Sequence, residues 1–159
     1  MFHRSNTHDS RRSRSGATVV EMAVVLPVFG IFLAGLMETG HAYMVMDVLN
    51  SAAKQAARLG ALEGKTSAQV LALAQAKIGG AVNPSDATVY IKDGSDFDTP
   101  GFDPTGISYS GLPDIEVQDA EARQLFIVRI EVPYNDVAIL PPFWIKDITL
   151  SGQAVMRHE

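Results

Sequence analysis

A run of 21 residues, Ala17–Met37, constrains the fold of this chain more than any other feature, because Glu21 is its only charged residue. A helix rises about 1.5 Å per residue, so a run of this length spans the ~30 Å hydrocarbon core of a bilayer. The run is also longer than the roughly 7–15 apolar residues of an ordinary secretory signal. We therefore expect a transmembrane helix rather than a cleaved signal or a buried core helix.

Charge is divided unevenly along the chain. Residues 1–16 contain four arginines and one aspartate, a net charge of +3, whereas residues 17–159 carry a net charge of −8. The basic flank predicts a cytoplasmic N-terminus, with the rest of the chain on the far side of the membrane. The acidic body argues against a nucleic-acid partner, because phosphate binding needs a basic face. The absence of cysteine excludes disulfides and thiolate metal sites.

Two residues inside the apolar run need an explanation. A charge such as that of Glu21 costs about 2.5–3.5 kcal/mol at the centre of a bilayer and less near its edge, so such a residue usually has a partner or a function. Pro27 removes one helical hydrogen bond and can kink the helix. Membrane helices tolerate proline well, so simple tolerance and a functional hinge both remain open for Pro27.

The stretch Gly16-Ala-Thr-Val-Val-Glu21, with arginines before it and an apolar run after it, resembles a prepilin processing site. The resemblance implies that a membrane peptidase cuts after Gly16 and leaves Ala17 as the new N-terminus. Glu21 then becomes the fifth residue of the mature chain. Its carboxylate would neutralise the new amine of the same or a neighbouring subunit, which lowers the cost of burying both charges.

Residues 15–62 are similar over a longer stretch to the TadE-like family, the minor pilins or pseudopilins of tight-adherence systems. The shared features are the Gly16–Glu21 pattern, Leu26-Pro27, Glu38, Tyr43 and a tail from Asn50 to Ala61, with departures at Lys54 and Leu59-Gly60. The resemblance implies a structural or assembly component of a pilus, held in the bacterial inner membrane with its head in the periplasm or outside the cell. Its implied partners are a prepilin peptidase, pilin subunits and other minor pilins, and it implies no cofactor.

The helical pattern continues beyond the apolar run, because no proline occurs between Glu38 and Leu62. One side of this helix is predicted to carry Val45, Leu49, Ala52, Ala53, Ala56 and Gly60. Small residues let another helix approach closely. Together with the resemblance, this favours packing of Ala52, Ala53, Ala56 and Gly60 on other subunits, with packing on the chain's own domain left open. Glu38 and His41 are interpreted as interfacial polar residues where the helix leaves the lipid.

The remainder of the chain predicts a small α+β head. A helix over 67–78 is expected, capped by Thr66 or Ser67 and ended by Gly79-Gly80. Strands are expected at 87–92, 124–134 and 148–156, with a further short one at 115–117. The expected fold class is α+β, a pilin-like long transmembrane helix followed by a second helix and a three- or four-stranded antiparallel sheet. The expected domains are a leader 1–16, a transmembrane helix 17–37, a helix extension 38–62 and an extracytoplasmic head 63–159.

The turn-rich segment 93–114 is acidic and raises the question of a calcium site. Oxygen ligands for Ca²⁺ would come from Asp93, Asp96, Asp98 and Asp103. The spacing of an EF-hand is absent, so a solvated loop is the main expectation and calcium binding the alternative. The aromatic residues Phe97, Phe102 and Tyr109 offer a contact surface. Phe143-Trp144 could form a similar surface, but filling of the local core is the main expectation for this pair.

Motifs of catalysis are missing from the sequence. No nucleophile elbow occurs, and Gly64-Lys65-Thr66 lacks both the spacing and the preceding strand of a phosphate-binding loop. We therefore expect no catalytic, metal or cofactor site, and an anchored enzyme is disfavoured. The alternative to a pilus component is an uncleaved, single-pass anchored binding or assembly protein.

Overall fold

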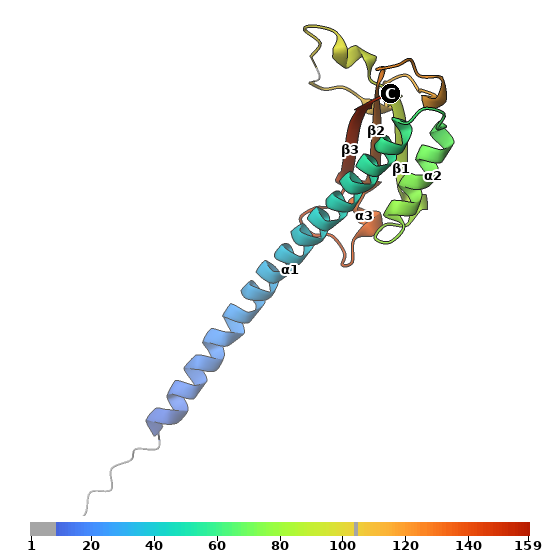
Figure 1. Ribbon diagram of the computed structural model, residues 1–159. Coiled ribbons are helices and arrows are strands. Elements are labelled where there is room, and N and C mark those ends of the chain that lie inside the picture. Colours follow the sequence, from blue (N-terminus) through green and yellow to red (C-terminus); the bar gives the residue numbers. More distant parts are fainter. Residues whose placement is uncertain (1–8, 104) are drawn as a thin grey trace, which may run out of the picture. The chain divides into compact units, whose positions relative to one another are not determined.

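The computed structural model describes residues 9–103 and 105–159, with side chains from residue 16 onward. The chain divides into two compact units, Met1–Met37 and Glu38–Glu159. Helix α1, Asp9–Gly60, contributes to both (Figure 1). The other helices and strands are α2 (Ser67–Ile78), β1 (Thr88–Asp93), β2 (Leu125–Pro133), α3 (Tyr134–Val137) and β3 (Thr149–Arg157). The expected α+β class is confirmed.

In the first unit, the residues of α1 from Ala17 to Met37 are exposed except for Ala34 and Gly35, which are half-buried. By length and composition, α1 can cross a membrane, and none of its most apolar stretch is buried. The helix begins at Asp9, within the segment expected to be a separate leader, and it continues through Pro27 without interruption. Water is a poor solvent for such a surface, so this unit needs an apolar environment.

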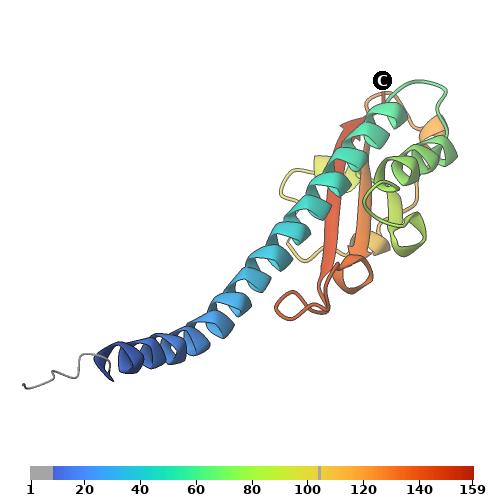
Figure 2. The same ribbon diagram turned by 90° about the horizontal axis from the view of Figure 1, so that it is seen from below.

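The second unit is built on an antiparallel sheet in the order β1-β2-β3. The register places Val89 opposite Ile130 and Ile130 opposite Gly152, so these residues share one face. The second half of α1 and helix α2 lie side by side on that face in both views (Figures 1 and 2). Because side chains alternate along a strand, this face carries the core residues Phe126, Val128, Ile130 and Val132 of β2, while Ile127 is buried on the other face.

The expected strand at 115–117 is wrong. Asp114 forms only an isolated bridge with Lys92, and a 3₁₀ turn follows at Val117–Asp119. The backbone of this segment bonds to side chains rather than to a neighbouring strand, since the Val117 N–H donates to Ser67 Oγ at 3.0 Å. The carboxylate of Glu116 likewise accepts from the Ser67 N–H at 2.6 Å. These contacts hold residues 115–117, which were expected to form a strand, against the start of α2.

Helix α2 forms where its caps predict. Thr66 Oγ1 accepts from the Gln69 N–H at 3.2 Å, and the Gln69 side chain accepts from the Thr66 N–H at 3.4 Å. This reciprocal pair is a capping box, which satisfies two N–H groups that the first turn leaves free. Val70, Ala74 and Ile78 recur every fourth residue and are fully buried.

The core lies between the sheet and the second half of α1. The buried residues of α1 are Ala42, Val45, Leu49, Ala52, Ala53, Ala56 and Ala57, each at most 5% exposed. Gly152 of β3 lies directly against α1, because a Cβ there would overlap the backbone of Leu49 and Asn50. A Cβ at Gly60 would lie 3.0 Å from Val70 and 3.2 Å from Phe126. Small side chains therefore bring the helix close to its own sheet.

This packing departs from the expectation for the small-residue stripe. Ala52, Ala53 and Ala56 are 0–1% exposed, and Gly60 is buried against α2 and β2. The stripe is thus occupied within its own unit and does not face outward to other subunits. The apolar face of the sheet is covered by α1 and α2. Burial of this face within the chain takes precedence over the tendency of small-residue stripes to pack against helices of other subunits.

The outer face of the sheet is partly covered by the segment that follows β1. Lys92 is 7% exposed and pairs with Asp114 at 2.7 Å. The guanidinium of Arg129 lies 4.3 Å from the ring centroid of Tyr109. Tyr109 is therefore half-buried against a cation rather than part of an open contact surface.

Gly152→Ala tests how closely α1 approaches the sheet. The added methyl group has no space against the α1 backbone, so we expect a loss of at least about 3 kcal/mol in the free energy of unfolding, the upper part of the overpacking range. Urea unfolding of the detergent-solubilised full chain measures this loss. Gly80→Ala is the matched control, since nothing lies within 4 Å of its Cβ position. Equal stability of the two variants would contradict the close approach.

Candidate functional site

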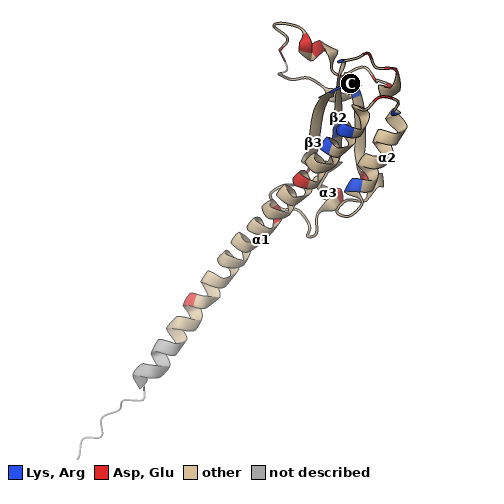
Figure 3. Ribbon diagram, viewed as in Figure 1, with Lys and Arg blue, Asp and Glu red and all other residues tan. Residues whose placement is uncertain are grey.

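The residues of the expected processing site lie together on α1. Gly16, Ala17 and Glu21 are exposed, and no atom lies within 4 Å of a Cβ placed on Gly16. Between Ala17 and Met37, Glu21 is the only charged residue, and this part of α1 is otherwise tan in Figure 3. Among the described residues, no hydrogen bond or ion pair holds the Glu21 carboxylate.

The helical backbone fixes the relation between Ala17 and Glu21. Residues four apart lie on the same face of a helix, with Cβ atoms about 5–6 Å apart. An amine created at Ala17 would therefore have the Glu21 carboxylate one turn above it. The same carboxylate would lie near the positive end of the shortened helix, which favours a negative charge.

A second carboxylate, that of Glu38, marks the start of the second unit and is fully engaged. It accepts from the backbone N–H groups of Phe143 at 3.0 Å, Trp144 at 3.1 Å and Ile145 at 2.7 Å. The backbone carbonyl of Glu38 accepts from the Tyr134 hydroxyl at 3.0 Å. Sequence reasoning placed Glu38 at the membrane edge but missed this contact, because its partners lie more than a hundred positions away.

The electrostatics of Glu38 follow from these contacts. Desolvation raises the pKa of its carboxyl, but the N–H groups of Ile145, Trp144 and Phe143 stabilise the ionised form more strongly, so its pKa is lowered. Burial raises the pKa of the Tyr134 hydroxyl, and the negative charge of Glu38 raises it further. The ring of His41 lies 5.9 Å from that of Tyr134. Glu38 and His41 thus both contact residues of the second unit.

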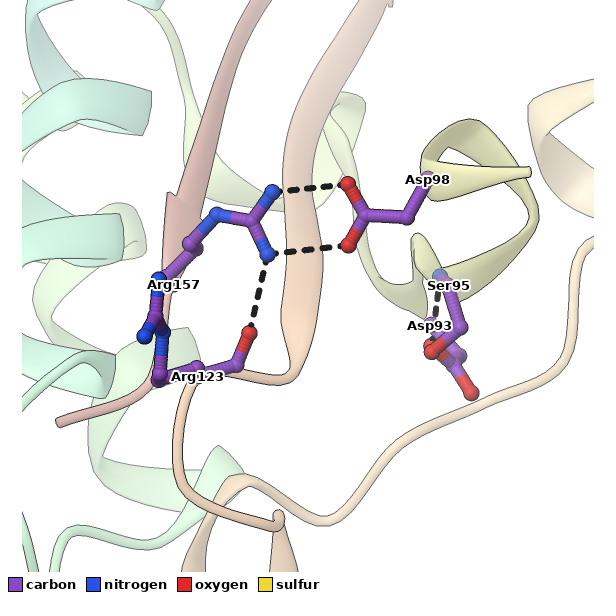
Figure 4. A network of polar contacts seen from close by, with 5 residues as sticks. All are labelled: Asp93, Ser95, Asp98, Arg123 and Arg157. Carbon is purple, nitrogen blue, oxygen red and sulfur yellow. Dashed lines mark hydrogen bonds and ion pairs between the residues drawn. The ribbon is translucent and has the colours of Figure 1, made fainter. Parts of the chain in front are cut away.

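Two carboxylates of the acidic segment, those of Asp93 and Asp98, are held by protein partners (Figure 4). Asp98 accepts two hydrogen bonds from Arg157, at 2.7 and 2.9 Å, and Arg157 also donates to the carbonyl of Arg123 at 3.1 Å. Asp93 accepts from the backbone and hydroxyl of Ser95. Hydrogen bonds and the Arg157 charge lower the pKa of Asp98.

These contacts bear on the calcium alternative. Asp103 accepts from the Thr105 N–H at 2.9 Å, so it too caps a turn. Within residues 9–103 and 105–159, no three histidine or acidic side chains gather where they could hold a metal ion. Phe97 and Phe102 meet edge to face with centroids 5.0 Å apart. The segment is thus held by its own polar and aromatic pairs.

The expectation that Phe143 and Trp144 fill the core is wrong. Phe143 is 77% exposed and Trp144 47% exposed, and the two rings meet edge to face at 4.7 Å. The reason is the contact with Glu38: it turns the N–H groups of this segment toward the helix, and Ile145 rather than either aromatic residue packs against the core.

Comparison with known proteins bears on the first half of the molecule. The family model described as TadE-like protein matches residues 16–58. The chain carries a TadE-like segment. The resemblance inferred from the sequence is confirmed, and the match begins at Gly16, the glycine of the expected processing site. No curated protein and no solved structure matches the chain. The TadE-like segment covers most of α1 and stops before α2, so it includes Glu21, Pro27 and Glu38.

The lowered pKa of Glu38 predicts a pH-dependent contribution to stability. Because the folded state favours the carboxylate, the contribution is complete above the ordinary glutamate value of 4.5 and is lost as the pH falls through the lower folded pKa. Glu38→Gln weakens the acceptor, so the variant should be less stable than the wild type near neutral pH. The difference should shrink in acid.

Thermal unfolding of both proteins between about pH 7 and about pH 3 measures this difference. Asp47→Asn, which alters an exposed carboxylate on the same helix, is the control and should track the wild type. A stability difference between wild type and Glu38→Gln that stays constant over this range would contradict the assignment.

Proposed function

We propose that the chain is a minor pilin or pseudopilin of a tight-adherence pilus, processed by a prepilin peptidase. The TadE-like segment associates the chain with such a pilus. The observation that carries the finer proposal is the Glu21 carboxylate, which stands in an exposed apolar helix without a partner among the described residues. A carboxylate in this setting needs a cation, and cutting after Gly16 creates one.

Processing would occur at the Gly16–Ala17 bond on the cytoplasmic side of the inner membrane. Helix α1 runs through this bond, so the peptidase must open the helix locally to reach it. Glycine makes that opening easier, because it favours the helix by about 1 kcal/mol less than alanine does. The cut removes residues 1–16 and with them the four arginines of the basic flank.

The mature chain would then be held by residues 17–37, with the second unit outside the cytoplasm. Glu21 would pair with the amine of Ala17 in the same or a neighbouring subunit and so set the register of assembly. We assign the contacts with pilin subunits and other minor pilins to the exposed surface around Pro27. Ala52, Ala53, Ala56 and Gly60 are excluded from this surface, because the head's own core covers them.

The proposed domain organisation follows. Residues 1–16 form the basic leader, 17–37 the transmembrane helix, 38–62 its extension and 63–159 the head. Residues 38–60 of the extension supply the core of the head and belong to it physically. The role is structural and involves no cofactor.

An uncleaved, single-pass anchored binding or assembly protein is the second candidate. The observation that favours it is the exposed Phe143–Trp144 pair, a surface that a binding head would use. Processing separates the two candidates, since only the pilin or pseudopilin needs a free amine at Ala17.

Glu21→Ala tests the assembly role. The variant should insert in the membrane as well as the wild type, because the change makes the segment more apolar. Breaking a buried ion pair costs about 3–5 kcal/mol, so piliation should fall at least about 100-fold. Pilus protein sheared from cells, divided by the amount of the chain in the membrane, measures the effect.

Met22→Ala is the matched control, since it alters the adjacent exposed side chain and leaves the charge in place. It should retain piliation. Normal piliation of the Glu21→Ala strain at wild-type membrane levels would exclude the assembly role of Glu21.

A further inference from the structure

The segment 139–148, here called the apolar loop, concentrates exposed apolar side chains. Within Glu38–Glu159, half of the exposed large hydrophobic residues fall in this short segment. They are Ile139 (77% exposed), Leu140 (54%), Phe143 (77%), Trp144 (47%) and Ile148 (48%). Scattered exposed apolar residues are normal on protein surfaces, but a contiguous group marks an interaction site.

The apolar loop is held in place by hydrogen bonds in its middle and at its C-terminal end. The Glu38 carboxylate accepts three backbone N–H groups in the middle of the segment, at 2.7–3.1 Å. Near its end, the Asn135 side chain donates to Asp147 at 2.7 Å, and the carbonyl of Ile148 accepts from the Tyr134 N–H at 2.8 Å. The backbone polar groups are thus turned inward while the apolar side chains face outward.

The contact with Glu38 also fixes where along α1 the apolar loop lies. Glu38 directly follows Met37, the last residue of the apolar run. The Phe143 and Trp144 backbones lie within one side-chain length of this helix position. With the helix leaving the lipid at Glu38, directly after the apolar run, these aromatic residues are at the level of the outer interface. Tryptophan and tyrosine are enriched at that level in membrane proteins, and exposed Tyr43 lies just over one turn further along α1.

The charges near the apolar loop point to an uncharged surface as its partner. Lys146 is the cation of the segment and Asp147 its anion, and Asp147 is bonded to Asn135. The loop therefore carries no net charge that would select an anionic lipid or a basic peptide. Apolar side chains projecting from a neutral, fixed backbone suit the boundary between headgroups and acyl chains.

We propose that the apolar loop is a second membrane contact, in which Glu38 holds Phe143 and Trp144 in the outer interface of the bilayer that α1 crosses. The inference rests on the membrane anchoring within the proposed function and is independent of processing. The occupant of the surface is phospholipid, and the contact fixes the head at the membrane before assembly.

Trp144 provides the test, because it is the single tryptophan of the chain. The full-length, uncleaved chain is reconstituted in phosphatidylcholine vesicles, in one preparation with lipid brominated near the headgroup end of its acyl chains. Flotation with the vesicles first reports anchoring. We expect the brominated lipid to quench about half or more of the Trp144 fluorescence, and aqueous iodide to quench far less than it quenches free tryptophan amide.

Glu38→Ala should lose most of the lipid quenching, because it removes the acceptor for the loop's N–H groups, while Asp47→Ala should retain it. Full iodide quenching without lipid quenching, in chains that float, would overturn the inference and leave the anchor intact. A third outcome is a tryptophan that bromine does not quench and that iodide quenches less as the protein-to-lipid ratio rises. This result would assign the surface to a second copy of the chain and would also overturn the inference. Undiminished lipid quenching in Glu38→Ala would refute the role of Glu38, and chains that fail to float would refute the anchor and the inference together.

Discussion

The packing of residues 38–60 of α1 on the three-stranded sheet is the contact on which the second unit depends. The sheet has one apolar face, and three strands alone cannot shield it from water. Alanines on α1 and Gly152 on β3 bring the helix and the strands into close contact. The second unit therefore depends on residues 38–60 of α1, which supply one side of its core.

Two glutamates on this helix have opposite environments. Glu38 is satisfied within the chain by three backbone N–H groups, so its charge is stabilised and its pKa is lowered. Glu21 is exposed in an apolar segment and has no such partner among the described residues. Glu38 holds the fold of its own unit. For Glu21, the missing partner supports our proposal that its cation comes from processing or from another subunit.

Local features of the chain could be predicted from the sequence because they depend on neighbouring residues. The cap expected at Thr66 or Ser67 and the alternation in Val128–Val132 depend on residues within a few positions, and they indicated α2 and β2 correctly. The TadE-like segment was also recognisable, because its Gly16–Glu21 pattern is contiguous. The ends of α2 and of the three strands lie within a residue of the expected ones, whereas α1 begins at Asp9, well before the expected start at residue 17.

Features that depend on distant residues could not be predicted. The segment 115–117 looks like a strand, but hydrogen bonds with Ser67, about fifty positions away, turn it into a 3₁₀ turn. Phe143 looks like a core residue until the contact with Glu38 turns it outward. The alanine stripe fits either a foreign helix or the chain's own sheet, and spacing alone does not distinguish them. A small-residue stripe therefore does not reveal its packing partner until the surface that faces it is known.

The state of the bond between Gly16 and Ala17 in cells tests the account most directly. Intact mass and N-terminal sequencing of the membrane-extracted chain, from cells with and without their prepilin peptidase, measure it. The account predicts a chain that begins at Ala17 when the peptidase is present and a chain that retains Gly16 when it is absent. A chain that retains Gly16 in cells whose peptidase processes another pilin would contradict it, and the uncleaved anchored protein would then be the better description.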